Sequence, residues 1–599
     1  MHYPQLRPAR ARKQFTQVFG GLNKSLKIRD GEWADTTNLS TRNFPLLSPR
    51  AARGVSDSAL TAPYAIGGNQ DGLAYVDGDK LYYKGDAVTG LTLSTASGMT
   101  DKRIIAFGAY LIVLPDYAYY NTANASDKGT IGNQVNKAAP VAYTMSRADG
   151  TAFTGATVSD TAPEGPTHGD YWIDTSADIH LLMQFSEMSN VWVSIPTTFV
   201  KLSGTGIGAG FNKGDGVTIS GCEAGSGEEG VVKAQIGALN GSRIIEDVGA
   251  DYVVISGILD QVYTQENGTV TINRELPLMD HVTVCGNRLW GCRCGTNNAG
   301  VTVNEIYASK LGDFRNFAVF QGISTDSYAV TVGQGGDFTG AASHQGYPVF
   351  FKEDVIYKVY GSRPANFQVA DTQARGVQAG SDRSLALVNE TLFYKSRDGI
   401  MSYDGAGPYK VSDALGEDFY DNARAGSLGD KYYISMQDAN DAWHLFVLDV
   451  KRNLWMREDA TQALGFHALA GELWWIDSDN KLVTAFGSAG TKETAVSWIA
   501  ISGLIGYDHP GRHYVSRMNM RVELAAKSTV TAYIKYDSAG DWVSIGQRTH
   551  NSTTTRTFLW PLIPRRCDHF HIKLEGSGHV AIYSIDKVLE RGGDGVGHV

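Results

Sequence analysis

Three of the five cysteines are the residues most suggestive of a metal site, because Cys285, Cys292 and Cys294 lie close together. Structural zinc sites use cysteine pairs at a C-x2-C spacing, which lets the chain wrap around the ion. In the string GCRCG, Cys292 and Cys294 instead fall on the same face of a strand, as buried thiols do. We therefore expect these cysteines to be core residues and not metal ligands.

Other polar motifs also fall short of a binding site. His569 and His571 alternate along a strand-like segment, but no third residue lies at a spacing typical of a metal-binding motif. The acidic turns at 212–216 and 477–480 do not continue into a calcium-binding loop. The glycine-rich string at 204–210 lacks both a GK[ST] sequence and the strand–loop–helix context of a phosphate site. We expect neither a metal ion nor a cofactor.

Catalytic motifs are missing from the sequence as well. It contains no G-x-S-x-G and no HExxH string, and no Ser, His and Asp set can be placed from spacing alone. Carboxylates are numerous, so a pair of the glycosidase type stays open. We predict that the chain is not an enzyme.

Aromatic residues fall into two groups. The pairs Tyr82–Tyr83, Tyr432–Tyr433 and Trp474–Trp475 recur at similar intervals, so we interpret them as packing within and between β-sheets. Three further aromatic residues do not share that interval and are candidate glycan contacts, because aromatic rings stack on sugars. They are Tyr171, Trp172 and Trp192.

The first 14 residues form a basic, proline-containing segment. Its cationic side chains are Arg7, Arg10, Arg12 and Lys13. Such a segment is either a solvated tail or an arm that docks on an acidic neighbour in an assembly. These four residues are the candidate assembly contacts.

The composition favours an all-β protein. Of 599 residues, 68 are glycine and 10% are aromatic, whereas only 19% are charged. Such a chain suits many short strands joined by tight turns, and it does not suit a helical bundle or a disordered chain. The net charge of −10 argues against wrapping nucleic acid, which requires a basic face.

The sequence also predicts a cellular compartment. Five cysteines are an odd and sparse set, which favours folding in a reducing cytoplasm. The polar start MHYPQLRPARARKQF lacks a secretory hydrophobic region, and no run of about 18 apolar residues occurs. We expect no membrane anchor.

One pattern recurs over 61–137 and 278–487: a Gly, Asn or Asp turn precedes an apolar or aromatic pair that opens an alternating strand. Leu392 to Tyr432 spans 40 residues, and Tyr432 to Leu473 spans 41. A four-stranded propeller blade needs about this length. Seven such anchors predict a β-propeller of about seven blades, although an antiparallel meander would produce the same local pattern. The anchors are Leu81, Leu111, Leu289, Val355, Leu392, Tyr432 and Leu473.

Five segments follow from these patterns. Small β domains inserted in a blade loop are tolerated, because loop-closure entropy grows slowly with loop length. The C-terminal stretch has alternating segments and hairpin turns typical of a jelly-roll-like β-sandwich. The segments are 1–60 (N-terminal arm and extended segment), 61–137 (first part of the propeller), 138–277 (inserted small β domain or domains), 278–487 (rest of the propeller) and 488–599 (β-sandwich).

Two passages resemble known proteins. The opening passage FGGLNKSLKIRDGEWADTTNLSTRNFPLLSPRAARG (19–54) resembles the beginnings of bacteriophage and prophage tail proteins, where a P-x-L-S-P-R-x-x-R-G sequence precedes a β-propeller. The closing passage AIYSIDKVLERGGD (581–594) resembles the end of the C-terminal β domain in the same group. Together they resemble the nozzle (tail tubular protein B) family of short-tailed phages. Residues 138–277 depart from that pattern.

The resemblance implies a structural virion protein of the phage tail, made and assembled in the host cytoplasm. Six copies in this family form a ring that continues the DNA-ejection channel and closes or gates it. The implied partners are adaptor or portal-proximal tail proteins, with tail fibres or spikes possible, and viral DNA that passes without sequence-specific binding. Two alternatives stay open: a glycan-binding host-recognition tail protein and a wall-degrading tail enzyme.

Overall fold

The computed structural model describes residues 11–152, 155–177, 180–195, 198–225, 230–333, 335–506, 512–538 and 540–591. Strands dominate these residues, which confirms the predicted all-β class. Helical structure in the described ranges is limited to α1 (Val231–Ala238) and the 3-10 turns η1 (Thr41–Asn43), η2 (Pro364–Asn366), η3 (Asp382–Ser384) and η4 (Asp413–Leu415). None of these described helices is long and apolar enough to span a membrane.

The chain divides into two compact units. The first unit comprises Met1–Asp116, Phe338–Lys358 and Asp371–Val599, and the second comprises Tyr117–Asp337 and Val359–Ala370.

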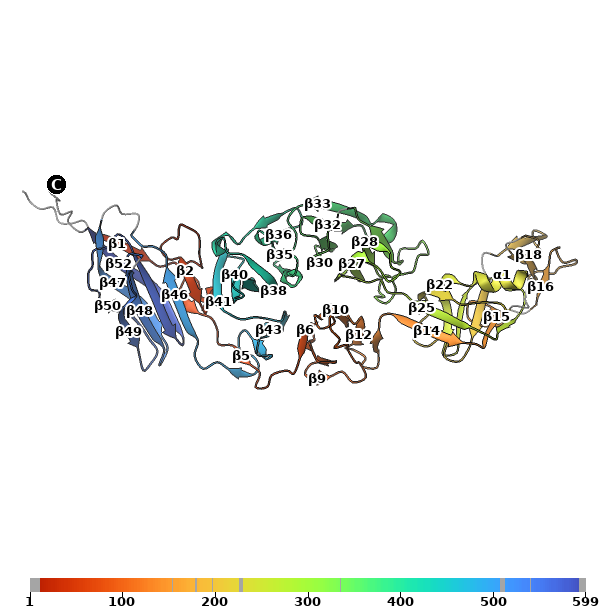
Figure 1. The fold of residues 1–599 in the computed structure, drawn as a ribbon, viewed down its shortest axis with the longest axis horizontal. Helices are drawn as coiled ribbons and strands as arrows, with labels where there is room; N and C mark the ends of the chain where they lie inside the picture. Colours follow the sequence, from red (N-terminus) through yellow and green to blue (C-terminus); the bar gives the residue numbers. More distant parts are fainter. Residues whose placement is uncertain are drawn as a thin grey trace, which may run out of the picture. The chain divides into compact units, whose positions relative to one another are not determined.

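Among the described residues, seven small sheets follow one another along the chain, with four strands each except the last, which has five (Figure 1). The first sheet holds β6 (Pro63–Asn69), β7 (Gly72–Asp77), β8 (Lys80–Tyr83) and β9 (Asp86–Ala87); the second β10 (Arg103–Phe107), β11 (Tyr110–Leu114), β12 (Ala118–Asn121) and β13 (Lys128–Thr130); the third β26 (His281–Cys285), β27 (Arg288–Thr296), β28 (Thr302–Ala308) and β29 (Tyr328–Thr331). The fourth holds β30 (Gly340–His344), β31 (Tyr347–Phe351), β32 (Val355–Tyr360) and β33 (Gln368–Gln373); the fifth β34 (Ala386–Val388), β35 (Thr391–Ser396), β36 (Gly399–Tyr403) and β37 (Pro408–Lys410). The sixth holds β38 (Tyr420–Leu428), β39 (Lys431–Asp438), β40 (Trp443–Asp449) and β41 (Leu454–Asp459); the seventh β42 (Phe466–Leu469), β43 (Glu472–Ile476), β44 (Leu482–Thr484), β5 (Gly54–Val55) and β45 (Thr491–Lys492).

Tight turns join the first two strands of these sheets. In the third sheet, Gly286 and Asn287 both have a φ of 58°, which a two-residue I′ hairpin turn requires. Five of the seven anchors follow the turn between the first two strands, whereas Leu81 and Val355 follow the turn before the third strand of their sheets. Each of the seven apolar anchors lies in a different sheet and is buried.

In the first unit, the opening strands of successive sheets lie side by side. β6 lies beside both β10 and β42, β42 beside β38, and β38 beside β34. The fourth and fifth sheets meet where β30 contacts η3 and the ring of Phe351 lies 5.1 Å from that of Tyr394.

In the second unit, side chains link the later strands of the second sheet to the third, and the third to the segment between β32 and β33. The Met279 backbone N–H donates to the Tyr117 hydroxyl at 2.9 Å, and the rings of Tyr119 and Phe314 lie 5.4 Å apart. Trp290 of β27 packs edge-on against Phe367 at 5.2 Å.

The insert between the second and third sheets contains an eight-stranded sheet, a four-stranded sheet and α1, within the described residues. The helix was not foreseen from the sequence, and it packs Ile236 into the insert's apolar core. The larger sheet has the order β14 (Asn133–Ala138), β25 (Thr269–Arg274), β21 (Gly216–Ser220), β22 (Gly241–Gly249), β23 (Tyr252–Ser256), β20 (Phe199–Ser203), β15 (Val141–Ser146) and β24 (Tyr263–Gln265). The smaller sheet has the order β16 (Ala156–Ser159), β17 (Tyr171–Asp174), β18 (Leu181–Ser186) and β19 (Val191–Ser194).

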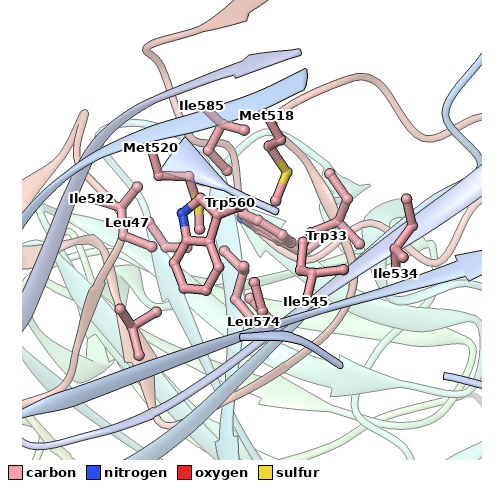
Figure 2. Close-up of a cluster of buried hydrophobic side chains, with 14 of the residues drawn as sticks. Trp33, Leu47, Met518, Met520, Ile534, Ile545, Trp560, Leu574, Ile582 and Ile585 are labelled. Atoms are coloured by element: carbon pink, nitrogen blue, oxygen red, sulfur yellow. The ribbon is translucent and has the colours of Figure 1, made fainter. Parts of the chain in front are cut away.

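Two facing sheets form a sandwich from the C-terminal stretch and the N-terminal passage (Figure 1). Alternation along β47 places Met518, Met520 and Val522 inside, where they meet Trp560 and Leu574 (Figure 2). One sheet has the order β1 (Arg12–Thr16), β52 (Val580–Arg591), β47 (His513–Leu524) and β50 (Thr554–Trp560). The other has the order β2 (Trp33–Thr37), β46 (Ser497–Ser502), β51 (Phe570–Ser577), β48 (Thr529–Tyr536) and β49 (Val543–Thr549).

Residues 11–60 are the described part of the N-terminal arm and extended segment expected over 1–60, and they contain short strands. Strands β1 and β2 join the two sandwich sheets, and β5 joins the seventh small sheet. The short strands β3 (Leu39–Ser40) and β4 (Ser48–Pro49) pair with each other. Local alternation does not reveal the pairings of β1, β2 and β5, because their partner strands lie more than 400 residues away in the sequence.

Candidate assembly site

Two of the four basic residues proposed as assembly contacts lie among the described residues. Arg7 and Arg10 lie outside the described residues, whereas Arg12 and Lys13 begin β1. Arg12 pairs with Leu589 and Lys13 with Val588 at the edge of the sandwich sheet. Charged side chains on an edge strand oppose uncontrolled pairing with other chains.

The two passages that resemble phage tail proteins pack together in one core. Leu47 and Ile582 exchange backbone hydrogen bonds of 3.2 and 2.9 Å, and both side chains are buried with Trp33 (Figure 2). The opening and closing passages are therefore one folded unit, held by apolar contacts across more than 500 residues of sequence.

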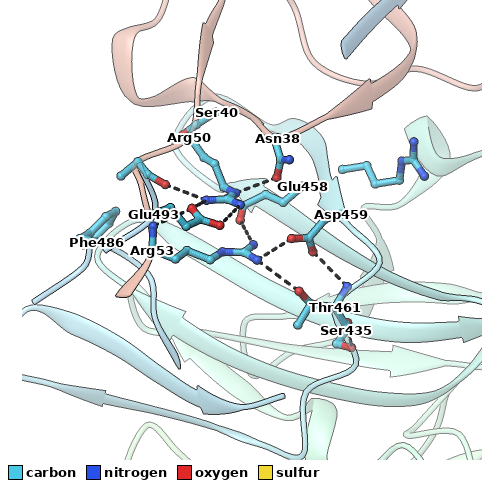
Figure 3. Close-up of polar contacts among 12 residues, drawn as sticks. Asn38, Ser40, Arg50, Arg53, Ser435, Glu458, Asp459, Thr461, Phe486 and Glu493 are labelled. Atoms are coloured by element: carbon cyan, nitrogen blue, oxygen red, sulfur yellow. Dashed lines mark hydrogen bonds and ion pairs between the residues drawn. The ribbon is translucent and has the colours of Figure 1, made fainter. Parts of the chain in front are cut away.

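Arg50 fixes the chain between the sandwich and the seventh sheet. Its guanidinium binds both carboxylate oxygens of Glu493, at 2.6 and 3.1 Å, and donates to the Asn38 side chain at 2.7 Å (Figure 3). A two-pronged arginine–carboxylate pair restricts orientation as well as distance. Glu493 precedes β46, so this pair holds the start of the sandwich against the N-terminal passage.

Arg53 makes a second, more deeply buried set of ion pairs. Its guanidinium lies 2.7 Å from the carboxylate of Glu458 and 2.5 Å from that of Asp459, both on β41 of the sixth sheet (Figure 3). It also donates to Thr461 at 3.2 Å and lies 5.0 Å from the Trp475 ring centroid. We call Arg50, Arg53, Glu458, Asp459 and Glu493 the arginine clamp.

Gly54 completes the clamp segment as the first residue of β5. A Cβ at this position would overlap the carbonyl oxygen of Ala489, which belongs to the backbone and cannot swing away. The backbone of β5 can approach that closely only without a side chain. The R-x-x-R-G string of the resemblance specifies Arg50, Arg53 and Gly54. The two arginines bind carboxylates, and the glycine permits the close approach of the backbone.

The pKa values of Asp459 and Glu493 lie below those of ordinary carboxylates. Burial alone would raise the pKa of Asp459, but the Arg53 guanidinium and hydrogen bonds from Thr461 together outweigh burial and bring that pKa below its ordinary 3.8. Burial likewise opposes ionisation of Glu493, but Arg50 and Arg53 together outweigh burial and bring the pKa of Glu493 below 4.5. Both groups therefore bind protons less readily in the folded chain than in the unfolded chain.

Acid is expected to weaken the clamp. A carboxylate whose pKa falls on folding stabilises the fold above its unfolded pKa and loses that contribution as the pH drops through its folded value. The free energy of unfolding should therefore fall below about pH 4, and the difference between the wild-type chain and Arg53→Ala should narrow there. Urea titrations at several pH values measure this, and a difference that stays constant with pH would contradict it.

Arg383 links three of the small sheets. This residue of η3, at the start of the fifth sheet, donates to the Leu464 carbonyl at 3.0 Å and to the Lys102 carbonyl at 2.7 Å, and pairs with Asp101. The neighbouring Asp382 pairs with Arg103 of β10. The fifth sheet is thereby tied to the second and the seventh, neither of which precedes or follows it in sequence.

The three candidate glycan residues do not form one surface. Trp172 is buried, donates its indole N–H to the Ser159 carbonyl at 3.0 Å, and packs edge-on against Trp192 at 5.5 Å. Tyr171 precedes Trp172 on β17, so its side chain points to the opposite face. This geometry does not favour a flat stacking platform for a sugar.

A cavity of about 720 Å³ lies beside α1 in the insert and includes His180 and Gln235 in its wall. Asp260 accepts a 2.7 Å hydrogen bond from the Gln235 side chain and lies 3.3 Å from Nδ1 of His180. His180, Gln235 and Asp260 thus bind one another and hold α1 against the segment before β18.

The sequence analysis missed the acidic half of the clamp. Glu458, Asp459 and Glu493 stand in ordinary strand or linker sequence, and spacing does not distinguish them from other surface carboxylates. The R-x-x-R-G string is the sequence feature that indicates acidic partners elsewhere in the chain. Two arginines next to a glycine in an otherwise apolar passage require acidic partners if the passage is buried.

No family model matches this chain, and no curated protein matches it. An engineered GH43 glycoside hydrolase with endo-xylanase and exo-arabinofuranosidase activity is 9% identical over 52% of this chain and 98% of its own, with a TM-score of 0.20. A bifunctional GH43-CE protein of Bacteroides eggerthii is 7% identical over 52% of this chain and 63% of its own, with a TM-score of 0.19. The extracellular domain of a putative hybrid two-component system from B. thetaiotaomicron is 9% identical over 92% of this chain and 98% of its own, with a TM-score of 0.24. Likeness at this level carries no conclusion about function.

Proposed function

We propose that this chain is a structural virion protein of a phage tail, in which about six copies form a ring that continues the DNA-ejection channel. The observation that carries the proposal is the shared core of the opening and closing passages. The two passages that resemble the nozzle family, 19–54 and 581–594, share one core through residues such as Leu47 and Ile582, and the opening passage supplies both arginines of the clamp. The resemblance thus rests on one coherent folded unit.

We further infer that the seven small sheets close into a seven-bladed propeller. Within the first unit the contacts run from the second sheet through the first, seventh, sixth and fifth to the fourth. Within the second unit, Tyr119 and Trp290 connect the second sheet to the third and the third to the segment before β33. Within each unit, the neighbouring sheets follow the order that a closed propeller would require, which supports this inference.

Arg383 supports the same arrangement and constrains the path of DNA. In a seven-bladed disc, the second, fifth and seventh blades meet only around the axis. A guanidinium that contacts all three would fill that axis, so DNA would pass between subunits of the ring and not through a propeller. The net charge of −10 fits a wall along which a polyanion moves without capture.

The oligomeric state of the purified full-length chain tests this proposal. Light scattering over a range of concentrations should show a closed oligomer of about six copies, since heterologous contacts that close form rings. Negative-stain images should show the ring end-on. A monomer at every concentration, together with its absence from purified phage tails, would overturn the proposal.

A further inference from the structure

The charge of this chain is distributed very unevenly. Residues 138–277 contain 17 acidic and 6 basic residues, a net charge of −11, against −10 for the whole chain. Within the insert, residues 148–200 contain seven acidic residues and no lysine or arginine. Residues 1–29, in contrast, contain seven basic residues and no acidic one.

The acidic stretch builds the small sheet β16–β19, whose last strand lies at an edge. Val191 and Val193 of β19 are 51% and 49% exposed, and the turn before it carries the fully exposed Met188. Glu187 stands in the same turn and is exposed. This edge therefore combines apolar side chains with nearby negative charge.

The backbone of β19 can accept a further strand. Ile195 donates to the Leu182 carbonyl at 2.8 Å, and Val193 lies opposite Gln184 on β18. Because bonded pairs alternate in an antiparallel ladder, Trp192 and Ser194 direct their backbone groups away from β18. Those groups face the open edge.

The outer strands of the seven small sheets are protected differently, whereas β16, at the opposite edge of the same sheet as β19, is also uncharged and has one exposed valine, Val158. β9, β13, β33, β37, β41 and β45 each contain at least one charged residue, as natural edge strands commonly do. β29 contains none, but its Val330 is not exposed. Strand β19 has the sequence VWVS and combines an uncharged edge with two exposed valines. Such an edge is a template for pairing with another chain.

We propose that the basic N-terminal arm of a neighbouring copy, residues 1–11, docks on β19 and adds a strand to this sheet. This inference rests on the proposed ring, because each copy would offer one arm and one acceptor edge. Arg7 and Arg10 would face the acidic stretch, and a guanidinium could stack on the half-buried Trp192. Proline has no backbone N–H to donate. Because Pro4 and Pro8 are four residues apart, an extended strand would place both of these positions on the same edge. The opposite side could pair with β19.

Charge exchange tests the contact. The arm variant R7E/R10E and the insert variant D160K/E164K/E187K should each lose the oligomer seen by light scattering for the wild-type chain, while circular dichroism melts stay unchanged. An equimolar mixture of the two variants should restore the oligomer, because each arm then meets an insert of opposite charge. The contrary result is that the mixture fails and the oligomer returns only when one chain carries both sets of changes. That result would show that the arm binds the insert of its own chain, and it would overturn the proposal.

The backbone contact has its own test. Ser194→Pro removes an outward N–H of β19 without removing a hydrogen bond to β18, so it should abolish the oligomer. Ser194→Ala is the matched control and should leave it intact. If all variants form the wild-type oligomer, the docking proposal fails and the ring stands. If the wild-type chain itself is monomeric at every concentration, the ring fails first.

Discussion

Replacing Arg53 with alanine is expected to lower the free energy of unfolding of the first unit by about 3 to 5 kcal/mol. The guanidinium is buried between Glu458 and Asp459, so its removal leaves two carboxylates with little water and no cation. Breaking a buried ion pair on one side costs far more than the pair contributes when intact. Urea denaturation followed by tryptophan fluorescence measures the loss, because Trp475 packs against Arg53.

Arg375→Ala is the matched control for this variant. Arg375 also pairs with two carboxylates, Asp354 and Asp398, but all three side chains are largely exposed. Solvent screens such pairs, so this variant should unfold at the wild-type midpoint. Equal effects of Arg53→Ala and Arg375→Ala would show that the arginine clamp does not stabilise the first unit.

The fragment 488–599 is expected to remain unfolded when it is expressed alone. It lacks β1, β2 and four large core side chains that the N-terminal passage supplies, namely Phe19, Trp33, Leu39 and Leu47. Burying such a side chain contributes about 1.5 to 3 kcal/mol, so the four together approach the whole stability of a typical domain. Amide proton dispersion in an NMR spectrum reports whether the fragment folds.

Fusing residues 11–50 to residues 488–591 through a short Gly/Ser linker should restore folding. The end of the first segment lies near the start of the second, because the Arg50 side chain binds Glu493 at 2.6 Å and Glu493 follows closely after residue 488. Within that fusion, Trp33→Ala should cost about 3 to 5 kcal/mol, whereas the same change at Trp542, which is only partly buried, should cost much less. A well-folded 488–599 fragment would contradict the shared core.

Local pattern was enough to find the small sheets. The turn residues Gly286 and Asn287 mark a hairpin because few residues accept positive φ, and Leu289 behind them alternates into the core. Both signals act within about ten residues of sequence. The seven anchors therefore fell in seven sheets without any knowledge of how the sheets contact one another.

Long-range pairing could not be predicted in the same way. Strand β1 has five residues and no apolar alternation, and it forms only because β52 offers its edge. Helix α1 was missed because only eight residues form it and its neighbours in sequence are strands. The interpretation of Tyr171, Trp172 and Trp192 as one group rested on residue type, whereas the pleat places them on two faces.

The measurement that tests the account most directly is a cryo-electron microscopy reconstruction of the intact phage tail that carries this chain. The account predicts a ring of about six copies, a seven-bladed disc in each copy, and DNA passing between the copies. A reconstruction that places the chain outside the tail, or as a single copy without ring contacts, would contradict it.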